Sequence, residues 1–123
     1  MISNKEKYFN LGTLKRDGNY VDTPVWFAKQ NVGSGFYVLA NIKSGKVKRL
    51  QNFNTARVAI CDWRGRLKGE RQPAFAELVA ESKDIIRLFR CKYGLVFYTF
   101  EFFSWLSKKR RQRQMILLTL DHQ

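Results

Sequence analysis

Short β-strand patterns separated by turn signals fill most of this chain, and they constrain its fold more than any other feature. The first pair of strands is expected at Phe9–Leu14 and Asn19–Ala28, and apolar and polar residues alternate along the second of them. Asp17 and Gly18 lie between the two segments, and this dipeptide favours tight hairpin turns. Pro24 interrupts the second segment. Because proline has no N–H to donate, this strand is expected at a sheet edge or at a bulge.

Further strand patterns and two helix patterns follow along the chain. The remaining strands are expected at Phe36–Ala40, Arg57–Asp62, Lys68–Val79 and Met115–Leu120, with a hairpin turn at Trp63–Arg66. One helix is expected over residues 44–52, and another from its N-cap Ser82 to about Tyr93. The aromatic segment Leu95–Leu106 is typical of a helix or of a mixture of strand and helix. The pattern predicts a mainly β fold with peripheral helices, a small barrel of six or so antiparallel strands, in a single domain spanning 1–123.

The segment from Thr23 to Cys61 contains no Asp or Glu, although it contains several lysines and arginines. Four of these cations crowd residues 43–50, where Ser44 is a good N-cap for the expected helix. A helix N-terminus carries roughly half a positive charge, so cations placed there repel it unless an anion binds. We therefore expect this helix start to bind a phosphate group. The alternative is a solvated basic face.

Composition bounds the classes of function. The chain has 123 residues, a hydrophobic fraction of 45% and a net charge of +13, so it is expected to fold and to attract anions such as nucleic acid, acidic lipid or phosphorylated small molecules. The sequence shows neither a secretory signal nor an apolar segment of membrane-spanning length, which indicates a cytoplasmic location. Cys61 and Cys91 lack the spacing of a metal site, and no metal is expected.

Several segments resemble, in order, the pyridoxamine 5'-phosphate oxidase-like superfamily of flavin-binding split β-barrels. They are Leu11–Leu14, Arg16–Gly18, Thr23–Phe27, Ser44–Leu50, Arg57–Ala59 with Cys61-Asp62 and Arg64–Arg66, and Lys92–Gly94. Within this superfamily the chain is most similar to the oxidoreductases that use the deazaflavin coenzyme or FMN. The resemblance implies a split barrel and a homodimer with two cofactor sites at the subunit interface.

The same resemblance assigns residues to the cofactor. Lys46, Lys48 and Arg49 would hold its phosphate, with help from Ser44. A second group, Thr23, Pro24, Val25 and Trp26, would lie along the flavin or deazaflavin ring. The cofactor itself transfers the hydride or electron to a small organic substrate. Because the cofactor would do the chemistry, the protein would need no nucleophile paired with a base. The sequence shows no such pair, and we assign no catalytic residue.

Two other classes of function compete with this interpretation. A nucleic-acid-binding barrel would also be basic and aromatic, but its cations would alternate with aromatic residues along the strands. Here they gather at one helix start and in the run Lys108–Arg113, which disfavours nucleic acid. Peripheral binding to an anionic membrane through the Phe-rich segment and that run is compatible with cofactor binding.

Overall fold

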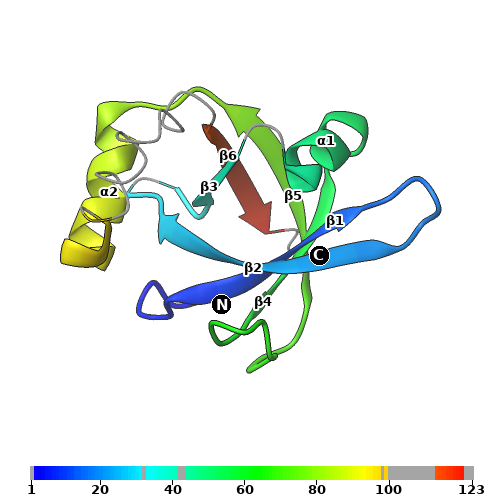
Figure 1. Cartoon of the computed structure of the whole chain (residues 1–123), viewed down its shortest axis with the longest axis horizontal. Coiled ribbons are helices and arrows are strands. Elements are labelled where there is room, and N and C mark those ends of the chain that lie inside the picture. Colours follow the sequence, from blue (N-terminus) through cyan, green and yellow to red (C-terminus); the bar gives the residue numbers. More distant parts are fainter. Residues whose placement is uncertain (1, 32, 42–43, 98, 100–112, 121–123) are drawn as a thin grey trace.

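Six antiparallel strands close into a barrel in the order β1–β2–β3–β6–β5–β4, and two helices flank it (Figure 1). The computed structural model describes residues 2–31, 33–41, 44–97, 99 and 113–120. The strands are β1 (Tyr8–Leu14), β2 (Tyr20–Lys29), β3 (Phe36–Asn41), β4 (Thr55–Ile60), β5 (Gln72–Val79) and β6 (Arg113–Leu120); the helices are α1 (Gly45–Asn52) and α2 (Lys83–Tyr93). The predicted antiparallel barrel with peripheral helices is confirmed.

Local sequence signals set the turns and the helix ends. Gly18 and Gly65 have φ angles of 87° and 86°, a conformation that glycine adopts without strain, and each lies in a hairpin turn. The side chain of Ser44 accepts a hydrogen bond from the Val47 N–H, and Ser82 caps α2 in the same way. The strand expected from Lys68 begins only at Gln72, because the preceding residues form an exposed loop of the hairpin.

The barrel opens between β2 and β3. β2 pairs with β1 along most of its length but with β3 at only three residue pairs, from Phe27 to Lys29. The N–H of Phe27 donates to the Tyr93 hydroxyl on the β1 side of the strand. Because main-chain groups alternate sides along a strand, the main chain of Pro24 faces the β3 side. A proline there offers β3 no N–H. The expected edge position of Pro24 agrees with this split.

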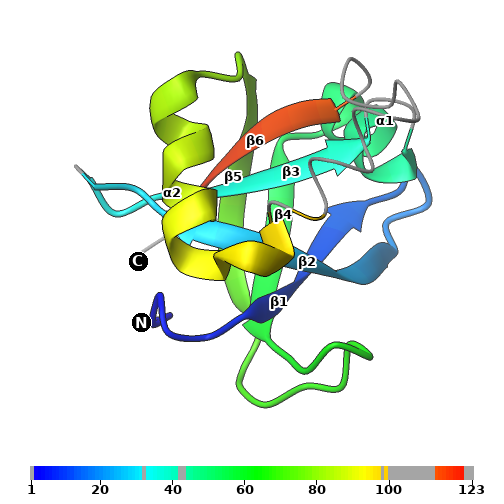
Figure 2. The same ribbon diagram turned by 60° about the vertical axis from the view of Figure 1, so that its left-hand side comes forward.

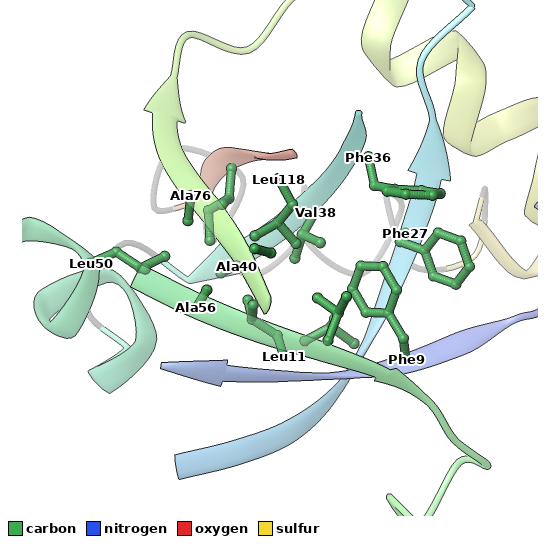
Figure 3. Packing of buried hydrophobic residues seen from close by; sticks show 14 of the residues in the cluster. Phe9, Leu11, Phe27, Phe36, Val38, Ala40, Leu50, Ala56, Ala76 and Leu118 are labelled. Atoms are coloured by element: carbon green, nitrogen blue, oxygen red, sulfur yellow. The ribbon is translucent and has the colours of Figure 1, made fainter. Parts of the chain in front are cut away.

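The core fills the barrel from both ends (Figure 3). At one end the rings of Phe9 and Phe27 stack with centroids 4.2 Å apart, and Phe36 meets both edge to face. At the other end Leu50 of α1 packs in the same cluster as small residues, including Ala56. Small strand residues therefore leave the space that the apolar face of α1 fills.

Helix α2 lies on the opposite side of the barrel from α1 and packs beside β2 (Figures 1 and 2). Its face carries Phe89, which joins a second apolar cluster with Phe97 and Met115. Leu95–Phe97 and Thr99 are helical, and the rest of the predicted Leu95–Leu106 segment lies outside the described residues. The basic run at 108–112 also lies outside them, while Arg113 begins β6 and forms an ion pair with Glu81.

The Tyr93 hydroxyl joins α2 to the first two strands. It accepts a hydrogen bond from the Phe27 N–H (2.9 Å) and lies 2.7 Å from the carbonyl oxygen of Lys7, to which it donates. Its ring stacks on Trp26 with centroids 4.7 Å apart. Burial raises the pKa of Tyr93, so the hydroxyl stays protonated and remains a donor. The β1–β2 pairing ends at Trp26, and the Tyr93 side chain supplies the hydrogen bond that Phe27 does not receive from β1.

We predict that Tyr93→Phe lowers the free energy of unfolding by about 1–3 kcal/mol, because it leaves the Phe27 N–H without its acceptor. Urea unfolding measures the change. Tyr20→Phe is the matched control, since the Tyr20 ring keeps its contact with Arg57 and its loss of a hydroxyl should change stability by less than about 0.5 kcal/mol. Equal effects of the two variants would contradict the bridging role.

Candidate cofactor site

A cavity of about 330 Å³ lies where β2 and β3 separate. Its walls come from both strands, from the start of α1, from α2 and from β1: Tyr8, Pro24, Val25, Trp26, Leu39, Ala40, Asn41, Lys46 and Phe89. The ladder between the two strands ends at Phe27, so the residues before it on β2 and after Val38 on β3 face each other across the opening. The split of the barrel therefore creates the cavity.

One wall of the cavity is apolar and held in place. Trp26 is fixed by its stacking on Tyr93, and the ring of Phe97 lies 6.3 Å away. Phe89 behind it is fully buried. Such a wall suits a flat ring, because aromatic and apolar surfaces stack on it without rearranging.

The other wall carries positive charge at the start of α1. Burial and the neighbouring Arg49 guanidinium lower the pKa of Lys46, which lines the cavity. Arg49 donates from Nε to the Thr13 hydroxyl at 2.6 Å, and its Nη1 lies 2.6 Å from where a Cβ on Gly45 would sit. The guanidinium therefore folds back over the helix start. In the part of the chain that the structure describes, no carboxylate forms an ion pair with Lys46 or Arg49.

Arg57, the last cation of the acid-free segment, does not belong to this cluster. Its Nη2 lies 2.7 Å from Oδ2 of Asp22, one residue before that segment begins. Both residues are register partners of Gly12, which lies between them on β1. A Cβ on Gly12 would collide with both side chains, so the glycine lets the ion pair form across β1. Arg57 is thus paired, whereas Lys46 and Arg49 of α1 form no ion pair with a carboxylate of the described residues.

The predicted site residues separate into two groups. Pro24, Val25, Trp26 and Lys46 line the cavity together. Outside the lining, Ser44 caps α1, Arg49 bonds to Thr13, and Lys48 is exposed on the helix. Thr23 has a buried Oγ1 that has no hydrogen-bond partner in the described part of the chain.

Sequence reasoning missed five lining residues, namely Tyr8, Leu39, Ala40, Asn41 and Phe89. Tyr8 could have been found, because the hairpin turn at Asp17-Gly18 sets the register that pairs it with Trp26. Phe89 could not, because an apolar helix residue predicts burial without saying against which strand.

Neither a metal-binding cluster nor a membrane-spanning helix is found within the described residues. No group of three or more His, Cys, Asp or Glu side chains among them could hold a metal ion. None of the helices found there is long and apolar enough to cross a membrane.

Comparison by sequence finds no matching family model and no matching curated protein. Comparison of structures finds the same fold in solved proteins. The heme storage protein HutZ from Vibrio cholerae is 14% identical, with a TM-score of 0.69 over 96% of this chain and 84% of that one. A pyridoxamine 5'-phosphate oxidase-related, FMN-binding protein from Nostoc punctiforme is 14% identical, with a TM-score of 0.61 over 93% of this chain and 71% of that one.

These similarities define the class of fold. The chain has the split β-barrel fold of the pyridoxamine 5'-phosphate oxidase-like proteins, as its sequence segments implied. At such low identity the similarity concerns the fold, and the same barrel serves both a heme storage protein and an FMN-binding protein. What this chain binds must be argued from its own residues.

We predict that Gly45→Ala weakens anion binding at α1 without unfolding the protein. The added methyl displaces the Arg49 guanidinium from the helix start, whereas alanine favours the helix by up to about 1 kcal/mol. Inorganic phosphate should therefore raise the Tm of the wild type more than that of the variant. Gly69→Ala is the control, because among the described residues a Cβ there meets only Ile60, at an ordinary contact distance of 3.7 Å. An equal phosphate effect in all three proteins would contradict the anion site.

Proposed function

We propose that the chain binds a phosphorylated flavin-type cofactor, FMN or the deazaflavin coenzyme, in the cavity of the barrel split. The bound protein would act in the cytoplasm as an oxidoreductase on a small organic substrate. One observation carries the proposal: a single cavity joins the apolar wall at Trp26 to Lys46 at a helix start, and Lys46 forms no ion pair with a carboxylate of the described residues. A flat ring that bears a phosphate chain matches both walls.

The residues fit the two ends of such a cofactor. Lys46 and Arg49 would hold the phosphate by charge-assisted hydrogen bonds, and the exposed Lys48 would add attraction at longer range. Ser44 would contribute through its place at the helix start. Thr23 lies outside the cavity lining, beside Pro24, and its buried Oγ1, which has no partner in the described part of the chain, would gain one if a polar ring atom reached it.

When bound, the cofactor supplies the hydride or electron transfer. The protein's residues bind and orient it: Pro24, Val25 and Trp26 would cover one face of the ring, and the apolar wall would exclude water from that face. No residue is assigned a catalytic role. Both cysteines are free, which suits a reducing compartment such as the cytoplasm.

A second copy of the chain would complete the site. The cavity volume of about 330 Å³ lies at the lower end of the range for ligand pockets, roughly 300–1,000 Å³. Large apolar side chains remain exposed around the barrel, among them Phe53, Trp63, Phe75, Leu95 and Val96. We propose a homodimer that covers part of this surface and closes the cofactor sites.

We predict a dimer by sedimentation at micromolar concentration in the presence of FMN. Burial of the exposed apolar side chains supplies the driving force. A monomer under these conditions, with FMN bound, would contradict the dimer while leaving cofactor binding intact.

We predict that Lys46→Glu combined with Arg49→Glu abolishes FMN binding and preserves the fold. Each lost charge-assisted hydrogen bond costs about 1.5–3 kcal/mol, so the pair should weaken FMN by at least a hundredfold. An acidic side chain at position 46, in the first turn of α1, suits the helix dipole, whereas Arg49 lies in the last turn and bonds to Thr13. The double variant should therefore stay folded at some cost in stability. Fluorescence titration measures FMN affinity, and circular dichroism follows the fold.

Riboflavin and Lys48→Glu provide the controls for this variant. Riboflavin has the same ring without the phosphate, so its affinity should hardly change in the double variant. Lys48→Glu reverses an exposed charge on the same helix and should weaken FMN far less than Lys46→Glu does. Titration with the deazaflavin coenzyme distinguishes the two flavin-type cofactors. Tight binding of hemin with no binding of either would overturn the proposal, as would wild-type FMN affinity in the double variant.

A further inference from the structure

A second cavity, of about 510 Å³, lies between α2, the end of β2 and the N-terminal segment. Its lining is Asn4, Ala28, Lys29, Asn31, Asp84, Arg87, Leu88, Cys91 and Lys92. None of these residues lines the cavity of the barrel split. Three of them are cationic and one is acidic, so the cavity favours a small anion.

Lys92 is held in an uncommon way for a lysine. Its Nζ lies 3.4 Å from the centroid of the buried Phe27 ring and 5.3 Å from that of Tyr93. That nitrogen is shielded from solvent and has no hydrogen-bond acceptor in the described part of the chain. The nearby Glu6 carboxylate pairs instead with Lys68, at 3.3 Å. Among the described residues, the direct contacts that compensate this ammonium are the faces of two aromatic rings.

This environment increases the fraction of neutral amine near neutral pH. Burial lowers the pKa of Lys92 to about 8, although the Glu6 carboxylate acts in the opposite direction. A neutral lysine amine is a nucleophile, and desolvation in an apolar site is one way in which proteins activate it. The four-carbon stem has enough rotatable bonds to move Nζ from the ring face into the adjoining cavity.

We propose that Lys92 is a reactive lysine that forms an imine with a small 2-oxo acid or other carboxylate-bearing carbonyl compound in this cavity. The neutral Nζ attacks the carbonyl carbon to form a carbinolamine. The carbinolamine then loses water to give the carbon–nitrogen double bond, and no oxidant or reductant is consumed. Lys29 and Arg87 would bind the carboxylate. This inference is independent of the flavin proposal, because the two cavities share no residue.

Reductive trapping tests the inference on the full-length chain. The protein is mixed with glyoxylate and sodium cyanoborohydride at pH 7.5, and the labelled lysines are located by peptide mass spectrometry. Lys92 should be modified at least about tenfold faster than Lys29 or Lys83, because far more of it is neutral at this pH. The α-amino group titrates in the same range and is distinguished by its own peptide.

Two variants and a neutral probe make the result specific. Lys92→Arg keeps the cation over Phe27 but has no amine to form the imine, so the fast label should disappear while circular dichroism is unchanged. Arg87→Gln should slow labelling by glyoxylate but not by propionaldehyde, which has no carboxylate. Labelling of Lys92 no faster than that of Lys29 and Lys83 would overturn the reactive lysine. If propionaldehyde labelled Lys92 selectively but glyoxylate did not, the reactive lysine would stand and the 2-oxo acid would be overturned as its ligand.

Discussion

The rest of the structure depends on the early end of the β2–β3 ladder. Those strands pair only from Phe27 to Lys29, and beyond that point β2 presents Pro24, which has no N–H, toward β3. Because the strands diverge there, the barrel has a cavity in its wall, and α1 after β3 reaches this cavity with Lys46. A ladder that continued to the end of β3 would close the wall and leave the cations of α1 facing solvent.

Phe27 links this cavity to the second one. Its main chain is held by the hydroxyl of Tyr93, whose ring positions Trp26 in the first cavity. Its own ring supports the ammonium of Lys92, which lines the second cavity. Lys92 and Tyr93, which are consecutive in α2, thus both contact Phe27: Tyr93 binds its backbone and Lys92 lies over its ring. The placement of α2 therefore shapes both cavities at once.

Sequence reasoning succeeded where the signal is local and failed where it is tertiary. The Asp17-Gly18 turn, the caps Ser44 and Ser82, and the strand alternation depend on neighbouring residues, so they predicted the elements and the barrel. The packing of Phe89 against β2 and the burial of Lys92 depend on where α2 lies, and a lysine within a helix ordinarily predicts a solvated side chain. The site residues on β2 were named through family resemblance, whereas their assembly with Lys46 around one cavity required the structure.

The distribution of charge separates structural cations from those available to ligands. Arg57 and Arg113 pair with carboxylates, and each pair joins neighbouring parts of the barrel. Lys46, Arg49 and Lys92 are half-buried, and none forms an ion pair with a carboxylate of the described residues. An exposed unpaired cation costs little, but a half-buried one loses hydration and destabilises the fold unless another group compensates. All three lie at or beside one of the two cavities, so an anion or a reactive ligand that enters there would supply the compensation that no carboxylate of the described residues gives them.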